Sequence, residues 1–269
     1  MPSPAWPGAS YRDWAETCDT LHAHTQVLGK LAATLAPPEP DFQHGALRLG
    51  VRGWETAPLP APDGSGSFGI VLDLHRHEGS VEHSDGRRRS VALTPDRAVG
   101  EVTSELLAVV ADLAGEVEID PAPAEVSWSV PLDEDTEHAR YDTEQVASYF
   151  AAATRAAAVL AAFRAPHEGR STPVNAWWGS FDLAVSLFSD GRESAVGWWP
   201  GDLRYPKAAF YAYLRPAPEG QGDRQVSPPA ARWDDGLGEF LLDWDDVRAA
   251  DDPAGFALEF ARSATGDQP

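Results

Sequence analysis

Cysteine is almost absent from this chain of 269 residues, in which Cys18 is the single example. A disulfide framework and a cysteine-based structural zinc site are therefore excluded, because each requires several thiols. Basic residues are also few, since 21 Lys and Arg stand against 42 Asp and Glu, for a formal charge of −21. This balance argues against nucleic acid and against an anionic membrane surface as partners, because both attract basic proteins.

Several other signals are missing. No apolar run approaches the roughly 18 residues of a membrane span, and the N-terminus lacks the basic start and apolar segment of a secretory signal. We therefore expect a cytoplasmic protein. The sequence also has no Walker loop, dinucleotide fingerprint, nucleophile elbow or HExxH motif, so we expect no cofactor. Hydrophobic residues make up 43% of the chain, which is enough for a packed core and excludes a disordered protein.

Periodicity predicts helices and strands in an irregular order along the chain. Helices are expected at Tyr11–Leu35, from Thr94-Pro95 to Gly115, from Asp142 to Arg164 and at Pro253–Ala264. Strands are expected from His44, at Ser67–His77, after a Gly79-Ser80 turn, and at Glu116–Ile119, Val174–Phe181, Leu183–Phe188, Gly197–Trp199, Ala208–Leu214 and Glu239–Leu242. This order favours an α+β fold with a mainly antiparallel sheet and two or three long packing helices. Because no long linker is present, we expect one domain over residues 11–264, with flexible ends at 1–10 and 265–269.

Several stretches of the chain resemble one known family. They include HTQVLGK at His24–Lys30, a D-x-x-H-x-x-Y-D run at Asp135–Asp142, WGSFDLAV at Trp178–Val185, GWWPG at Gly197–Gly201 and EFLLDWDDVR at Glu239–Arg248. In this order they resemble an uncharacterised bacterial family, domain of unknown function 5996. The resemblance covers nearly the whole chain and implies a single family-wide domain, with no assigned activity. Compared with the pattern of the family it resembles, this chain differs in two places. Asn175 stands where the family pattern has a His, and the segment between Phe188 and Gly197 is shorter.

The D-x-x-H-x-x-Y-D run has two readings. In the first, Asp135 and His138 form an acid/base pair with Tyr141 nearby, because a carboxylate beside an imidazole orients it and raises its pKa. In the second, Asp142 is a helix N-cap and the rest is a solvated loop.

The WWGSFD segment also has two readings. If it is a strand, Trp178, Ser180 and Asp182 share one face, and Asp182 could serve as a general base or ligand anchor in an aromatic-walled pocket. Alternatively the aromatic residues are core, and Gly179 marks a bulge. An Asp inside an apolar strand needs a partner in either case.

The spacing of the histidines gives little support for a metal site. His75 and His77 would share a strand face, but His83 would lie on the opposite one, so a three-His site fails and no metal is expected. Aromatic residues from Trp198 to Tyr213 are expected to form core and pocket wall.

We therefore expect a small-molecule site in an aromatic-lined cleft. If the protein is an enzyme, acid/base or hydrolytic chemistry is expected; the alternative is a non-catalytic binding or interaction protein in which the same residues are structural. Lys30 and Arg164 are candidate anchors for an anionic group, and His138 and Asp182 are predicted to share a pocket with Trp178 in its wall. The catalytic candidates are His138, Asp182 and Tyr141, and the ligand-binding candidates are His24, Lys30, His44, Arg164, Trp178, Trp199 and Tyr211.

Overall fold

The fold is α+β with antiparallel pairing throughout its strand ladders, as predicted. A computed structural model describes residues 5–266. The strands form two sheets in place of one, with the orders β1-β2-β4-β5-β6 and β12-β13-β11-β10-β9-β7. Their bounds are β1 Arg48–Leu49, β2 Gly53–Glu55, β3 Leu59–Pro60, β4 Ser67–Asp73, β5 Glu78–His83, β6 Arg88–Ala92, β7 Arg170–Ser171, β8 Asn175–Trp177, β9 Asp182–Ser189, β10 Arg192–Trp199, β11 Ala209–Arg215, β12 Arg232–Asp234 and β13 Glu239–Asp243.

The long helices lie close to their predicted positions. Their bounds, with those of the short 3-10 helices, are η1 Tyr11–Asp13, α1 Ala15–Leu35, η2 Pro40–Gly45, α2 Val99–Ala114, α3 Thr143–Arg164, η3 Gln221–Asp223, α4 Trp244–Ala249 and α5 Pro253–Thr265. Two helices begin about four residues later than predicted. The helix expected from Tyr11 starts at Ala15, because Tyr11–Asp13 form the 3-10 helix η1. Helix α2 starts after Ala98, whose backbone is extended, because Asp96 takes a left-handed φ of 67°. The short α4 was not predicted.

The chain folds as two compact units that interleave along the sequence. One, here called the β4 unit, comprises Trp14–Phe150 and Ala176–Phe181. The other, the β10 unit, comprises the remaining described residues, 5–13, 151–175 and 182–266. Helix α3 and the Phe181–Asp182 peptide bond each carry the chain from the β4 unit into the β10 unit. That the chain forms a single domain therefore stays a prediction about cooperativity.

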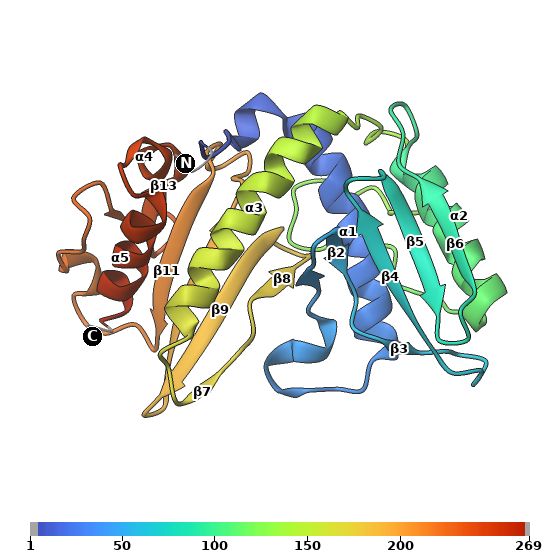
Figure 1. The fold of residues 1–269 in the computed structure, drawn as a ribbon, viewed down its shortest axis with the longest axis horizontal. Helices are drawn as coiled ribbons and strands as arrows, with labels where there is room; N and C mark the ends of the chain where they lie inside the picture. The colour runs from blue at the N-terminus through green and yellow to red at the C-terminus, as the bar shows by residue number, and fades with distance from the viewer. Residues whose placement is uncertain (1–4, 267–269) are drawn as a thin grey trace. The chain divides into compact units, whose positions relative to one another are not determined.

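Two helices complete the core of the β4 unit. Helix α2 packs against β5 and β6, and α1 packs against α2 and β3 (Figure 1). Leu21 and Leu28 of α1, Ile70 of β4 and Val81 of β5 are completely buried. At about 25 cal/mol for each Å² of apolar surface removed from water, such side chains supply most of the stabilisation.

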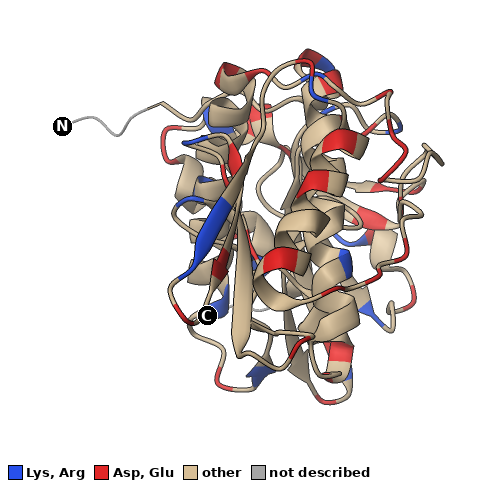
Figure 2. Cartoon of the chain, turned by 90° about the vertical axis from the view of Figure 1, so that its right-hand side faces the viewer, with Lys and Arg blue, Asp and Glu red and all other residues tan. Residues whose placement is uncertain are grey.

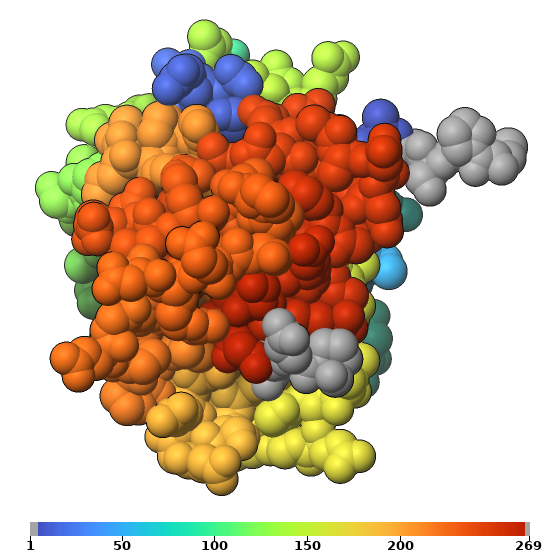
Figure 3. Space-filling model, turned by 90° about the vertical axis from the view of Figure 1, so that its left-hand side faces the viewer, coloured from blue at the N-terminus to red at the C-terminus, as the bar shows by residue number. Residues whose placement is uncertain are grey.

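The sheet of the β10 unit has one apolar and one polar face. Helix α5 packs against β10, β11 and β13, and the C-terminal segment is drawn orange to red in Figure 3. Alternate residues such as Trp198, Phe210 and Phe240 are completely buried. Because side chains alternate across a strand, the opposite face carries Trp199 and Tyr211 together with acidic residues.

Several strand predictions are wrong, and local capping explains the first. The predicted Ser67–His77 strand ends at Asp73, whose carboxylate accepts hydrogen bonds from the amides of His75 and Arg76, at 3.1 and 2.9 Å. The chain turns there, and His77 takes a left-handed φ of 54°. His75 and His77 therefore share no strand face. The predicted Gly79-Ser80 turn is wrong as well, because both residues lie inside β5, and His83 pairs with Phe68.

The predicted strand Val174–Phe181 is also wrong beyond Trp177. The chain turns after that residue, and Phe181 takes a left-handed φ of 56° before β9 begins at Asp182. The alternation expected for Trp178, Ser180 and Asp182 does not apply across this turn. No regular structure forms at residues 116–119, where a strand was predicted. The strand expected from His44 begins only at Arg48, because His44 lies in the 3-10 helix η2.

Among the described residues, α3 alone is long and apolar enough to cross a membrane by length and composition, and half of its most apolar window is buried. A core helix passes the same test.

Candidate functional site

Asp135 and His138 form a tight pair in the segment that joins α2 to α3. Asp135 is completely buried. One of its oxygens, Oδ1, accepts hydrogen bonds from the amides of Glu137 and His138 at 2.9 and 3.0 Å. The other, Oδ2, lies 2.7 Å from Nδ1 of the His138 ring. The D-x-x-H spacing allows this arrangement, because an Asp side chain readily caps the amides two and three residues ahead.

The pair is electrostatically coupled. The hydrogen bond that His138 donates to the Asp135 carboxylate raises the pKa of His138, although partial burial of the ring opposes it. Burial acts to raise the pKa of Asp135, but the hydrogen bonds from His138 and Glu137 outweigh it and lower that pKa. In neutral His138, a proton on Nδ1 donated to Asp135 leaves Nε2 as the basic atom.

His138 Nε2 makes no hydrogen bond to any described residue, and 15% of the side chain is exposed. The ring of Trp128 lies 4.8 Å from that of His138, between centroids. Its Nε1 is buried without a partner, as is Nδ1 of His24. Two buried nitrogens of the same unit therefore lack a hydrogen-bond partner, which is uncommon for buried polar groups.

Two further imidazoles are held neutral in the same unit. Burial lowers the pKa of His22 and of His24 to about 4. The charges of Asp135, Arg97 and His138 also act on the pKa of His24. His22 is well bonded, with Nε2 at 2.8 Å from the carbonyl oxygen of Trp178, so it has a structural role that the sequence did not reveal.

Asp182 belongs to the β10 unit and is 3% exposed. The phenol of Tyr211 donates a hydrogen bond to its carboxylate. The strand register explains the contact. Ala184 of β9 and Tyr211 of β11 both pair with Gly197 of β10, so they lie on either side of it. Asp182 is two residues from Ala184 and therefore points to the same face of the sheet, where the Tyr211 phenol reaches it. A Cβ at Gly197 would lie 2.2 Å from the Tyr211 ring, so glycine makes room for the phenol. Tyr211 and Asp182, both predicted site residues, are thus brought together.

More polar residues share this face of the sheet. Burial, and secondly the charge of Asp182, raises the pKa of Glu239 to about 7. Trp199 packs edge-on against Tyr211, with 5.6 Å between ring centroids, and Tyr213 stacks on Tyr211 at 6.3 Å. Glu239 was not predicted, and Tyr213 was expected only among the aromatic residues of the core and pocket wall. Strand alternation could have placed them beside Tyr211, but only once the register of three strands was known.

A second polar cluster in the β10 unit surrounds Asp243. Its carboxylate accepts hydrogen bonds from Tyr205 and from Lys207, the latter at 2.8 Å, and lies 3.1 Å from Arg232 Nη2. A small cavity of about 140 Å³ adjoins it, lined by Ser10, Lys207, Ala208, Asp243, Trp244, Asp245 and Asp246. The Asp243 charge is thus already balanced by two cations.

The other predicted residues have local partners. Tyr141 is 2% exposed, and its hydroxyl lies 3.2 Å from His77 Nδ1. Burial raises the pKa of Tyr141, so it is a poor proton donor at neutral pH. His44 accepts the Glu39 amide at 3.1 Å. Arg164 is exposed and donates to Ser171 at 3.1 Å.

Lys30 and Trp178 lie together in the β4 unit. The Lys30 ammonium sits over the Trp178 ring, 5.6 Å from its centroid. Burial lowers the pKa of Lys30. The indole nitrogen donates to the Gly45 carbonyl at 2.9 Å, which fixes the ring. A cation over an aromatic face is a satisfied arrangement, so Lys30 is a weaker candidate for an anion anchor than its charge suggested.

The predicted residues therefore fall into two groups. His24, Lys30, His44, His138, Tyr141 and Trp178 belong to the β4 unit, and Arg164, Asp182, Trp199 and Tyr211 to the β10 unit. A pocket shared by His138 and Asp182 stays a prediction. Within residues 5–266, no group of three or more His, Cys, Asp or Glu is placed to hold a metal ion.

Comparison with known proteins gives one match. A model of a family of unknown function, DUF5996, matches residues 6–196 and 191–266. No curated protein and no solved structure matches the chain. The two matched segments together run over nearly all of both units, in agreement with the resemblance seen in the sequence. The chain therefore belongs to the DUF5996 family, whose function is unknown.

Proposed function

We propose that the protein binds a small polar molecule beside His138 in the β4 unit and exchanges a proton with it through Nε2. The observation that carries this proposal is the 2.7 Å contact between His138 Nδ1 and the buried Asp135 carboxylate. A carboxylate behind an imidazole fixes its orientation and tautomer and favours the protonated ring, which is the arrangement that general acid/base catalysis uses. Acid/base or hydrolytic chemistry is the reaction class it supports.

The surroundings suggest what the ligand carries. Trp128 Nε1 can only donate a hydrogen bond, and protonated His138 also donates. A ligand oxygen with negative charge, such as a carboxylate, would accept from both. Neutral His24 could donate or accept at its unpartnered Nδ1. We therefore propose a small oxyanion-bearing molecule as the ligand class.

The charge distribution supports a small molecule over a polyanion. Acidic residues, red in Figure 2, recur over helices and loops, whereas basic ones are sparse. With a formal charge of −21, the protein would repel nucleic acid and anionic lipid. A cytoplasmic location remains part of this proposal.

A non-catalytic role for the pair is the alternative, favoured by a specific observation. Asp135 Oδ1 accepts two backbone amides, which is what a loop-capping residue does. The two roles differ in what His138 contributes. A cap needs only the Asp135 side chain, whereas proton exchange needs the imidazole.

The test compares His138→Gln with His44→Gln as a matched control, because both histidines lie in the same unit and have a local partner for Nδ1. Small molecules extracted from purified wild-type protein are identified by mass spectrometry, and a panel of small carboxylates and phosphates is screened by thermal shift. We expect a compound that stabilises wild type and His44→Gln but binds His138→Gln at least about tenfold more weakly, for about 1.4 kcal/mol of lost interaction. Equal binding by all three proteins would overturn the proposal.

A further inference from the structure

A small cavity lies in the β10 unit beside the carboxylate of Asp243. Its volume is about 140 Å³. A cavity of about 150 Å³ holds a benzene molecule, so this one suits a ligand of about six non-hydrogen atoms. Its lining is mixed, with Lys207, three aspartates and the wall residues Ser10, Ala208 and Trp244. All of them belong to the β10 unit, so the site is separate from His138 and does not depend on the function proposed there.

The walls of the cavity are fixed by hydrogen bonds. The Trp244 amide donates to the Ala208 carbonyl at 2.9 Å, and its indole nitrogen donates to the Pro7 carbonyl at 2.8 Å. The Ser10 hydroxyl donates to the Pro206 carbonyl at 2.9 Å. Because a hydroxyl oxygen has two lone pairs, Ser10 can still accept a hydrogen bond from a ligand. The lining is thus held in place before a ligand arrives, which reduces the entropy cost of binding.

The lining carries a positive charge in excess. Lys207 Nζ lies 2.8 Å from Asp243 Oδ2, and Arg232 Nη2 lies 3.1 Å from Asp243 Oδ1. Two cations therefore face one carboxylate. The Lys207 side chain is 53% exposed, and an ammonium has three donors, of which Asp243 takes one. Lys207 can therefore also donate to a carboxylate on a ligand.

The lining also carries an unpaired negative charge. Asp245 is paired with Arg248, whose Nη1 lies 2.9 Å from Asp245 Oδ1. Asp246 is exposed, and its carboxylate makes no hydrogen bond or ion pair to a described residue. A carboxylate without a partner at the edge of a cavity attracts a positively charged group. The ammonium group of a ligand would supply that charge.

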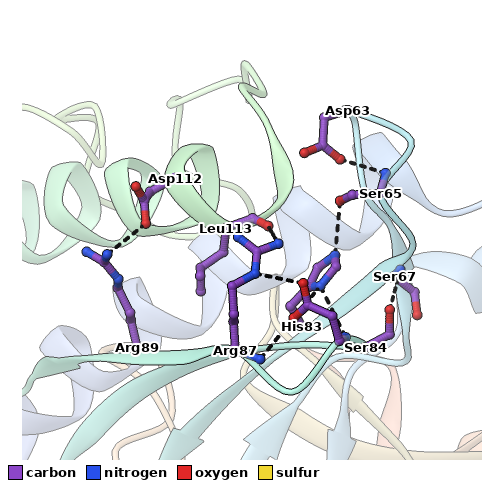
Figure 4. A network of polar contacts seen from close by, with 10 residues as sticks. Asp63, Ser65, Ser67, His83, Ser84, Arg87, Arg89, Asp112 and Leu113 are labelled. Atoms are coloured by element: carbon purple, nitrogen blue, oxygen red, sulfur yellow. Dashed lines mark hydrogen bonds and ion pairs between the residues drawn. The ribbon is translucent and has the colours of Figure 1, made fainter.

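The polar network at the end of the β4–β5 hairpin is self-contained by comparison (Figure 4). The amide of Asp85 donates to His83 Nδ1 at 3.3 Å, so Nε2 carries the proton and donates to Ser65 Oγ at 3.1 Å. Arg87 donates to the Asp85 carboxylate at 2.7 Å and to the Leu113 carbonyl at 2.9 Å. These groups satisfy one another, so the network ties the turn to the end of α2 and leaves no charge for a ligand.

We propose that the cavity beside Asp243 binds a small zwitterion, a molecule with both a carboxylate and an ammonium group, such as a short amino acid. The ligand carboxylate accepts from Lys207, and its ammonium lies near Asp246 and donates to Ser10 Oγ. The three aspartates of the lining are already balanced by Lys207 and two arginines. A ligand without net charge keeps this balance, whereas an anion or a cation alone would disturb it.

The test measures binding of L-alanine to the full chain by isothermal titration calorimetry. Propionate and ethylammonium are the matched ligands, because propionate is L-alanine without its amino group and ethylammonium is L-alanine without its carboxylate. We expect saturable binding of L-alanine, and at least about tenfold weaker binding of either analogue, since each lacks one charged contact. An analogue that binds as tightly as L-alanine would show that the cavity recognises one charge only, and it would overturn the proposal.

Lys207→Gln and Asp246→Asn each remove one charge from the lining. We expect each to weaken L-alanine binding at least about fivefold, as for the loss of one exposed charge contact of about 1 kcal/mol. Asp251→Asn is the matched control and should bind like wild type, because Asp251 is an exposed aspartate of the same unit that does not line the cavity.

Two results would overturn the site itself. One is the absence of saturable L-alanine binding to folded wild type, and the other is binding that neither Lys207→Gln nor Asp246→Asn weakens more than Asp251→Asn does. Circular dichroism checks the folding of each variant. Asp246 is exposed and has no partner among the described residues, so its variant keeps the test valid should loss of the Lys207–Asp243 contact disturb the fold.

Discussion

Asp135 and His138 titrate against each other, so the stability they provide depends on pH. The pKa of His138 is raised in the folded state, so its contribution is complete below its ordinary pKa of about 6.5 and is lost as pH rises through the raised value. The pKa of Asp135 is lowered, so its contribution is complete above about 3.9 and is lost as pH falls through the lowered value. The contact should stabilise most between about pH 4 and 6.5.

Asp135→Asn is therefore expected to lower the free energy of unfolding by about 1–2 kcal/mol at pH 5.5, because a buried charge-assisted hydrogen bond is lost. The loss should be smaller at pH 8.5. Urea unfolding at the two pH values measures it, and NMR titration should show a lower pKa for His138. Glu134→Gln, an exposed change in the same segment, is the control. An equal loss at both pH values would show that Asp135 acts through its amide contacts alone.

Glu239 has the opposite dependence, since its pKa is raised from 4.5 to about 7 by burial first and by Asp182 second. The β10 unit should therefore lose stability as pH rises through about 7. Glu239→Gln removes the charge, and we expect it to be more stable than wild type at pH 8.5 by on the order of 1 kcal/mol, and equal to it at pH 4. Thermal unfolding across this range is the measurement. A variant less stable than wild type at pH 8.5 would show that the Glu239 carboxylate is satisfied when charged.

Glycine at position 29 interrupts an otherwise regular helix for a packing reason. A Cβ there would lie 2.0 Å from the Trp178 ring, so α1 needs a bare backbone at this point. Intrinsic propensity favours Ala over Gly by about 1 kcal/mol. We nevertheless expect Gly29→Ala to destabilise by about 1–3 kcal/mol, because overpacking outweighs propensity. Chemical denaturation measures the change, with Thr34→Ala at an exposed position of the same helix as control. If Gly29→Ala gains stability, Trp178 is free to move.

Elements with long apolar periodicity could be predicted from the sequence, whereas those ended by side-chain caps could not. Helices α1, α3 and α5 lie within a few residues of expectation, because each repeats its apolar positions over several turns. The strand through His75 failed because Asp73 caps the amides that would have continued the ladder. A single side-chain contact of this kind leaves no periodic signal.

The contacts of the candidate site residues also divide into those that the sequence could predict and those that it could not. The Asp135–His138 pair spans three residues and could be anticipated from the D-x-x-H spacing alone. The Tyr211–Asp182 contact joins residues 29 apart and depends on the pairing of β9, β10 and β11. A one-residue slip in register would have sent Tyr211 to the opposite face. The sequence could therefore name both residues as candidates without revealing that they touch.

For the molecule as a whole, the question is whether the two units unfold together. The ten tryptophans are shared equally, so fluorescence reports on both units. Because α3 runs from one unit into the other, we expect thermal unfolding followed by fluorescence and by far-UV circular dichroism to coincide in one transition. Two well-separated transitions would contradict a single cooperative domain. Trp14, Trp54, Trp128, Trp177 and Trp178 report on the β4 unit, and Trp6, Trp198, Trp199, Trp233 and Trp244 on the β10 unit.

The interleaving of the units has a consequence for how such a protein can be inherited and made. The β4 unit includes Ala176–Phe181, so it is incomplete until the ribosome has synthesised residue 181. By then residues 151–175, which belong to the β10 unit, have already been synthesised. No single crossover between two genes can move either unit intact into another protein.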